Sequence, residues 1–260
     1  METNRRRQTG RVGAAFLVLG ALALLVAPAN AFIRIDDFRD PQTLVLPDGV
    51  TAVSGSATGP GMGAIPERDV VLRRLGETPG ELTLTVDAGF SERLVVDDPF
   101  GVPAALSLVY DGLDGDEAID PAGGDVDLTE LGTEDRFALR LQADFGVDLR
   151  VQVFDRTDPS GNTWSAGVLA VPATALLRWV ELPFLALDEM GPNGHADLRD
   201  VGAILFELTG PEGLGLQIDE IRVPEPDAGA AGLAALLALG ALRRTLRPPR
   251  PRRVEFSLAR

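Results

Sequence analysis

Short runs of alternating apolar and polar residues recur through the middle of the chain, and this pattern constrains the fold most. Eight such runs occur, over 81–86, 93–96, 105–110, 136–141, 148–154, 178–182, 201–208 and 215–223. Because successive side chains of a strand point to opposite sides, this alternation gives each strand one apolar and one polar face. Clusters of Gly, Pro and Asp separate the runs, as turns require. The pattern predicts an all-β fold.

The predicted domain spans 32–222 and is a single β-sandwich, with a jelly roll as the expected form. No long stretch of it keeps a helical period, and its length is sufficient for one all-β core without disulfides. The Gly-rich segment 54–63 is interpreted as a surface loop, because strands follow too closely on both sides for a linker between two domains.

Composition excludes several kinds of site. The 260 residues carry a formal net charge of −15, with no Cys and one His. The absence of Cys excludes disulfides and Cys-ligated zinc or iron–sulfur centres, and one His cannot form a multi-histidine metal site. The acidic balance argues against nucleic acid as a partner, because phosphate-backbone binding relies on Lys and Arg.

The N-terminus, residues 1–31, has the three parts of a secretory signal peptide. A positive segment is followed by an apolar stretch over 12–26, and Ala29-Asn30-Ala31 supplies a small-x-small cleavage pattern. The mature chain is therefore predicted to begin at Phe32 after export through the Sec translocon. An uncleaved anchor helix is the alternative.

The C-terminus is a second candidate targeting segment. It consists of the motif Val223-Pro224-Glu225-Pro226, an apolar stretch over 228–242, and a basic tail over 243–260 that starts with Arg243 and Arg244. As a helix, the 15 apolar residues would extend about 22 Å, which is short for a bilayer core about 30 Å thick. The arginines that follow predict a cytoplasmic position for that end.

These three parts, in this order at the chain end, resemble the PEP-CTERM sorting signal of Gram-negative bacteria. The resemblance implies a precursor held transiently in the inner membrane and processed by an exosortase-like enzyme. It further implies export to the cell surface or extracellular matrix, with exopolysaccharide as an expected partner. The chain departs from the pattern in one respect, because its tail continues 18 residues past Leu242. A plain tail anchor is the alternative.

The body resembles secreted PEP-CTERM proteins with a galactose-binding-like or carbohydrate-binding-module-like sandwich. The segments that carry the resemblance are 35–38, 110–115, 135–137, 200–204 and 216–221. Each is short, so the resemblance implies a fold more than a ligand.

Carboxylates concentrate between residues 111 and 127, which makes Ca²⁺ the expected cofactor if any is bound. Asp111, Asp114 and Asp116 are the candidate ligands, because carboxylate and backbone oxygens on a glycine-bent loop suit this ion. The EF-hand pattern fails, since Ala118 and Ile119 stand where Asp or Asn and then Gly are required. A solvated acidic loop is the alternative interpretation.

A second calcium hypothesis comes from the resemblance alone. Jelly-roll sugar-binding modules often hold a structural calcium near their terminal strands, which would bring Asp36 (or Asp37) together with Asp219 (or Glu220). Ordinary solvent-facing residues on alternating strands are the alternative.

Sugar binding requires exposed aromatic faces beside hydrogen-bonding groups. Trp164 and Tyr110 are the candidate contacts, whereas Trp179 lies in an alternating run and is expected to be half-buried. His195 and Asp197 could form a general-base pair, but no Gly-x-Ser-x-Gly motif accompanies them, and a surface histidine is the preferred interpretation.

We therefore predict no catalytic residues and a non-enzymatic protein with a structural, adhesive or polysaccharide-binding role. The alternative is a secreted polysaccharide hydrolase or lyase on the same fold. A cleft with converging carboxylates of raised pKa would favour the enzyme.

Overall fold

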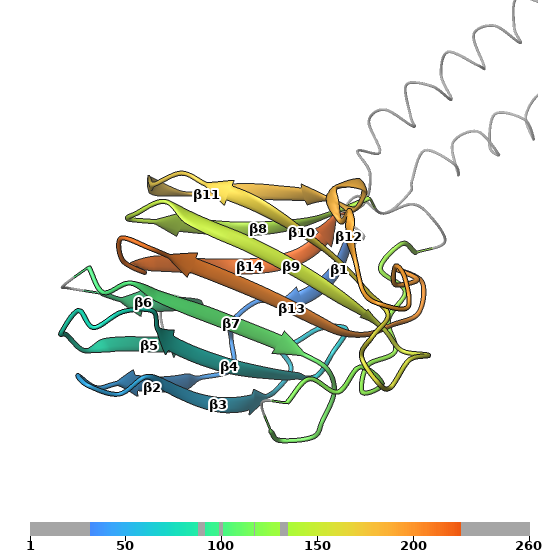
Figure 1. Cartoon of the computed structure of the whole chain (residues 1–260), viewed down its shortest axis with the longest axis horizontal. Helices are drawn as coiled ribbons and strands as arrows, with labels where there is room; N and C mark the ends of the chain where they lie inside the picture. Colours follow the sequence, from blue (N-terminus) through green and yellow to red (C-terminus); the bar gives the residue numbers. More distant parts are fainter. Residues whose placement is uncertain (1–31, 88–91, 99–100, 117, 131–134, 225–260) are drawn as a thin grey trace, which may run out of the picture. The chain divides into compact units, whose positions relative to one another are not determined.

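The computed structural model describes residues 32–87, 92–98, 101–116, 118–130 and 135–224, all of which belong to one compact unit. In this part of the chain, two seven-stranded sheets pack face to face (Figure 1), and the one helix is a short 3-10 turn, Phe184–Ala186. The prediction of an all-β sandwich is confirmed. The jelly-roll and galactose-binding-like assignments stay predictions.

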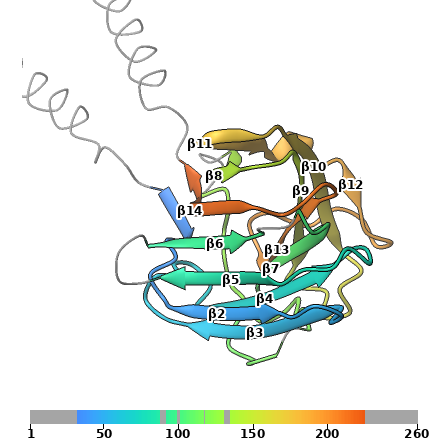
Figure 2. The same cartoon turned by 90° about the vertical axis from the view of Figure 1, so that its left-hand side faces the viewer.

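The first sheet has the strand order β11-β8-β14-β6-β5-β2, and β1 pairs with the C-terminal part of β14, residues 221–224. Figure 2 shows its strands from β11 at the top to β2 near the bottom. Its members are β1 (Phe32–Asp36), β2 (Gln42–Leu46), β5 (Leu82–Asp87), β6 (Arg93–Asp97), β8 (Arg136–Ala143), β11 (Thr174–Pro183) and β14 (Leu216–Pro224).

The second sheet has the order β12-β10-β9-β13-β7-β4-β3. Its members are β3 (Ala52–Thr58), β4 (Glu67–Arg74), β7 (Ala104–Tyr110), β9 (Val147–Asp155), β10 (Trp164–Val171), β12 (Glu189–Met190) and β13 (Val201–Gly210). The chain crosses repeatedly between the sheets, so neighbouring strands are often far apart in sequence.

The core fills the space between the sheets, and the alternating runs explain how. On β5, Leu82, Leu84 and Val86 are buried, while Thr83 and Thr85 between them are half-exposed. All eight predicted runs overlap strands, and on β7 residues of both faces are buried. Burial of one face of each strand is therefore what joins the two layers.

The expectation of a surface loop over 54–63 is corrected in part, because β3 extends through Thr58. This strand pairs with β4 at the edge of the second sheet. Its small side chains leave room for the first sheet, since a Cβ on Gly55 would lie 3.1 Å from a methyl group of Leu44. The Gly-rich composition predicted a loop because glycine is common in loops. In the structure, the small residues of this segment instead allow the two sheets to pack closely.

Of the predicted targeting segments, the structure describes the first two residues of the C-terminal motif. Val223 and Pro224, placed in the sorting motif by sequence, are the last two residues of β14 and pair with Ile33 and Phe32. The segments 1–31 and 225–260 lie outside the described residues. Within the described residues, no helix is long and apolar enough to cross a membrane.

Candidate functional site

The outer face of the first sheet is hollowed where four of its strands lie side by side. The hollow has a volume of about 360 Å³. Its lining comes from β5, β6, β8, β14 and the chain next to them: Thr83, Thr85, Val95, Val96, Asp97, Asp98, Gln142, Asp144, Leu216 and Gln217. We call this feature the outer hollow.

Strand register places a row of side chains directly across the outer hollow. Thr85 pairs with Val95, Val95 with Gln217, and Gln217 with Gln142, so one row crosses four strands. All four residues are half-exposed, whereas their neighbours along each strand are buried. Because paired residues on one face lie about 5 Å apart, the row forms a continuous strip.

The strip can both donate and accept hydrogen bonds. Amide groups of Gln142 and Gln217 offer NH₂ donors and carbonyl acceptors, and the threonine hydroxyls do both. Asp97 adds an exposed carboxylate opposite Thr83. Asp98 has a structural role, since its carboxylate accepts from the backbone N–H of Val102 at 2.8 Å and of Leu214 at 2.9 Å.

Arginines dominate the next part of the same face. Asp219 accepts from Arg93 Nε at 3.0 Å and from Arg140 Nη1 at 2.6 Å. Nearby, the guanidinium of Arg222 lies 3.9 Å from the centre of the Trp179 ring. Trp179 is 39% exposed, so part of its surface remains open to solvent.

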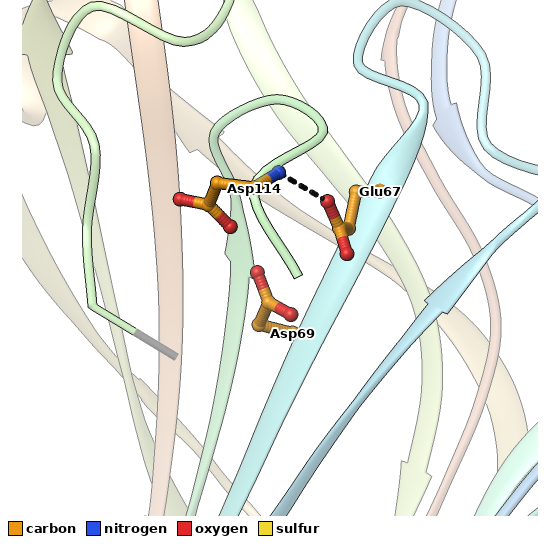
Figure 3. A group of neighbouring side chains, drawn as sticks. All are labelled: Glu67, Asp69 and Asp114. Atoms are coloured by element: carbon orange, nitrogen blue, oxygen red, sulfur yellow. Dashed lines mark hydrogen bonds between the residues drawn. The ribbon is translucent and has the colours of Figure 1, made fainter. Parts of the chain in front are cut away.

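Carboxylates converge on the outer face of the second sheet. Ligand oxygens of Glu67, Asp69 and Asp114 all lie within 4.8 Å of one another (Figure 3). Asp69 is fully buried, and neither of its carboxylate oxygens has a hydrogen-bond partner. Asp111 is also fully buried, and its Oδ1 lacks a partner. We call these four residues the acidic cluster.

The pKa values within the acidic cluster are raised. Burial, followed by repulsion from Asp111, Glu67 and Asp114, raises the pKa of Asp69 to about 8. Burial likewise raises the pKa of Asp111 to about 6, although the backbone N–H of Asp120 opposes the shift. Ionisation of these carboxyl groups is therefore unfavourable unless a cation compensates the charge.

The structure separates Asp36 from Asp219, whereas the alternative residues Asp37, Asp219 and Glu220 line one hollow that they share with arginines. Asp36 is buried between the sheets, where Oδ2 accepts from Arg68 at 2.6 Å and from the Tyr110 hydroxyl at 2.9 Å. Asp219 binds arginines on the outer face of the first sheet. Asp116 is exposed and accepts from the backbone N–H of Ala118, outside the converging group.

The aromatic candidates lie in two different environments. Tyr110 is fully buried, so it belongs to the core rather than to a surface that sugars reach. Trp164 is half-buried on β10 of the second sheet, with the Arg150 guanidinium 5.8 Å from its ring centre. Neither residue adjoins the outer hollow.

His195 is exposed, and its Nδ1 lies 3.1 Å from Ser165 Oγ. The backbone N–H of Asp197 donates to Asp155. The contacts of these residues are thus those of a hydrogen-bonded surface loop.

Sequence reasoning did not identify the polar row or two members of the acidic cluster. Thr83, Thr85, Gln142 and Gln217 carried a usable signal, since they occupy the polar face of alternating runs. Glu67 and Asp69 carried almost none, because Glu-Arg-Asp resembles an exposed charged turn.

No protein-family model matches the chain, and no curated protein sequence matches it. Among solved structures, the chain is similar to the family 11 carbohydrate-binding module of the cellulase Lic26A-Cel5E of Clostridium thermocellum. The two share 15% identity and a TM-score of 0.36 over 76% of this chain and 96% of the module. The chain is also similar to the solution structure of CtCBM11, with 13% sequence identity and a TM-score of 0.38. The match covers 77% of this chain and 99% of that module. A family 29 carbohydrate-binding module has 10% sequence identity to this chain and a TM-score of 0.33. The match covers 71% of this chain and 88% of the module. At this level of similarity, function has to be argued from the site itself.

Proposed function

We propose that this chain is an exported, non-enzymatic β-sandwich protein that binds a neutral polysaccharide in the outer hollow. The observation that carries the proposal is the row across four neighbouring strands, in which Thr85, Gln217 and Gln142 are polar and Val95 lies between Thr85 and Gln217. A sugar ring presents hydroxyl groups that each donate and accept hydrogen bonds. Amide and hydroxyl side chains on a rigid sheet satisfy both requirements at fixed spacing.

The negative charge of the hollow and of the domain favours binding of a neutral polysaccharide over an acidic one. Three carboxylates line the outer hollow, those of Asp97, Asp98 and Asp144, and no Arg is among its lining residues. The span 32–226 carries 13 Arg against 36 Asp plus Glu, a net charge of −23. A polyanion would therefore be repelled both at the hollow and by the protein as a whole.

Size and form also suit a segment of a polymer. A volume of about 360 Å³ lies toward the lower end of ligand sites, which span about 300–1,000 Å³. The hollow lies on the outer face of a sheet, so a chain that enters can continue beyond it at both sides. An adhesive or matrix role follows from holding such a polymer without cleaving it.

The enzyme alternative would require converging carboxylates of raised pKa that substrate can reach. Asp69 and Asp111 have raised pKa values and converge, but both are fully buried. A glycosidic bond must lie directly between the acid and the base or nucleophile. The buried position of this pair therefore supports a binding protein.

Replacing both Gln142 and Gln217 with alanine should weaken polysaccharide binding by about tenfold or more. Each lost hydrogen bond contributes about 0.5–1.5 kcal/mol, and 1.4 kcal/mol corresponds to a factor of ten. Affinity electrophoresis through gels that contain neutral or acidic polysaccharides measures the change.

Gln152→Ala is the matched control, since Gln152 is half-exposed on β9 of the other sheet. Equal retardation of the double variant and the unaltered protein in every gel would contradict the site.

We also propose that the ends of the chain direct export and sorting, as the sequence predicts. The support is the order of the C-terminal parts, in which 223–226 is followed by 15 apolar residues and then by Arg243 and Arg244. Prolines on both sides of Glu225 restrict the backbone of the motif to extended conformations. A processing enzyme at the membrane surface could read such a segment.

Glu225→Ala should block maturation in a host that has an exosortase. The precursor would then accumulate in the inner membrane, because the carboxylate between the two prolines is lost while the apolar segment is kept. Immunoblots of fractionated cells measure the ratio of precursor to mature protein. A Glu255→Ala variant, altered near the end of the tail, should mature normally. Normal processing of Glu225→Ala would contradict the sorting proposal.

A further inference from the structure

We propose that the acidic cluster of Glu67, Asp69, Asp111 and Asp114 is a Ca²⁺ site that ties the loop after β7 to the start of β4. The site lies on the outer face of the second sheet and is independent of polysaccharide binding in the outer hollow. This location differs from the predicted calcium site at Asp36 and Asp219. It keeps Asp111 and Asp114 of the predicted loop site and adds Glu67 and Asp69 from β4.

Strand geometry sets the cluster. On β4, Arg68, Val70 and Leu72 are fully buried toward the first sheet, so Glu67 and Asp69 point to the opposite side. Asp69 pairs with Val109 across the ladder between β4 and β7. Continuing that register by two residues brings Glu67 level with Asp111.

The loop that follows folds back over these carboxylates. Gly112 has φ of +118°, and a Cβ there would overlap the backbone of Gly123. Asp111 Oδ2 accepts from the backbone N–H of Asp120 at 2.7 Å, which fixes one side of the carboxylate. Glu67 Oε2 accepts from the backbone N–H of Asp114 at 2.8 Å (Figure 3). Loop and strand are therefore already held in the arrangement that a shared ion requires.

Unpartnered buried oxygens distinguish this cluster from an ordinary acidic loop. Both oxygens of Asp69 and Oδ1 of Asp111 are buried without a hydrogen-bond partner. In the described part of the chain, every ion pair made by an arginine goes to a carboxylate outside the cluster. Burial of a charge without compensation is costly, so the arrangement needs a cation or a proton.

The type and number of the ligands favour Ca²⁺. Ca²⁺ takes 6–8 oxygen ligands at 2.3–2.6 Å, so oxygens on opposite sides of the ion lie about 4.6–5.2 Å apart. The oxygens of Glu67, Asp69 and Asp114 lie within 4.8 Å of one another, close enough for one ion to contact all three. Mg²⁺ binds at about 2.0–2.1 Å and retains several waters, so it usually takes one or two carboxylates rather than four. The rival to an ion is one proton shared by Asp69 and Asp111.

Calorimetric titration of the metal-stripped full chain with CaCl₂ tests the site. We expect one Ca²⁺ per chain, and a rise of about 5–10 °C in Tm when free Ca²⁺ is 100 times its Kd. MgCl₂ should give a smaller rise. Asp69→Asn should reduce Ca²⁺ affinity at least 100-fold, and Asp111→Asn should do the same.

The control is Asp116→Asn, an isosteric change at an exposed position of the same loop, which should bind Ca²⁺ as the unaltered chain does. Without Ca²⁺, Asp69→Asn should melt no lower than the unaltered chain, because the change removes repulsion. If this variant fails to fold, Glu67→Gln provides the same binding comparison. Absence of Ca²⁺ binding by the unaltered chain, or undiminished binding by Asp69→Asn, would overturn the proposal and favour the shared proton.

Discussion

Arg68→Met should lower the free energy of unfolding by about 3–5 kcal/mol, because it leaves a buried charge without its partner. Arg68 and Asp36 are both fully buried, and Nη1 of Arg68 lies 2.6 Å from Oδ2 of Asp36. The guanidinium also donates to Gln42 Oε1 at 3.2 Å and to the Asp40 carbonyl at 3.0 Å. Loss of the arginine therefore removes the donor to Gln42 Oε1 and to the Asp40 carbonyl, and leaves Asp36 Oδ2 with the Tyr110 hydroxyl.

The deficit should depend on pH. Burial raises the pKa of Asp36 above its ordinary value of 3.8, while the Arg68 charge lowers it, so the variant should have a still higher pKa. An acid whose folded pKa is raised contributes stability below its unfolded pKa and loses it as pH rises through the folded pKa. The difference between the variant and the unaltered protein should be largest near neutral pH and smaller near pH 4.

Urea unfolding of both proteins at pH 4 and pH 7 measures these differences. Arg150→Met is the control, since Arg150 makes an equally short contact of 2.6 Å with Glu189 at the surface. Exposed pairs contribute at most about 1 kcal/mol. If Arg68→Met cost no more than Arg150→Met, the ion pair between Arg68 on β4 and Asp36 on β1 would not stabilise the packing of the two sheets.

Phe206→Ala should lower the free energy of unfolding by about 3–5 kcal/mol, the range for a fully buried aromatic residue. Phe206 lies on β13 of the second sheet, and its ring centre is 5.5 Å from that of Phe137 on β8 of the first. It also meets Tyr110 edge to face at 6.0 Å. The truncation therefore removes the aromatic contact between the layers and leaves a cavity.

Thermal and urea unfolding of Phe206→Ala should show one cooperative transition at lower stability. Leu185→Ala is the control, because Leu185 is 97% exposed and its loss should change stability by no more than about 0.5 kcal/mol. An effect of Phe206→Ala as small as that of the control would contradict the packing of the core.

The alternation on a strand such as β5 could be predicted from sequence, whereas the burial of β4 on both faces could not. On β5 the alternation of apolar residues with Thr predicts which side of the strand is buried. On β4, Glu67, Arg68, Asp69 and Val70 are buried in succession, so the sequence shows no alternation. Charged residues of this strand are buried because partners or neighbours from distant segments cover them, and a local pattern cannot report that.

The candidate sites depend on the order of the strands. Thr85 and Gln142 belong to runs that sequence analysis recognised, but they meet only because β6 and β14 lie between β5 and β8. The acidic cluster shows the same limit, since Asp111 and Asp114 were proposed from the density of carboxylates. Glu67 and Asp69 reach the cluster only because β4 pairs with β7.

Polysaccharide binding in the outer hollow can be followed residue by residue in an NMR titration. Neutral oligosaccharides that are retained in affinity electrophoresis would be added to isotope-labelled protein while backbone amide shifts are followed. We predict shifts on β5, β6, β8 and β14, including the side-chain amides of Gln142 and Gln217, with little change at Gln152. Shifts confined to the second sheet, or no shifts with any neutral oligosaccharide, would contradict the assignment.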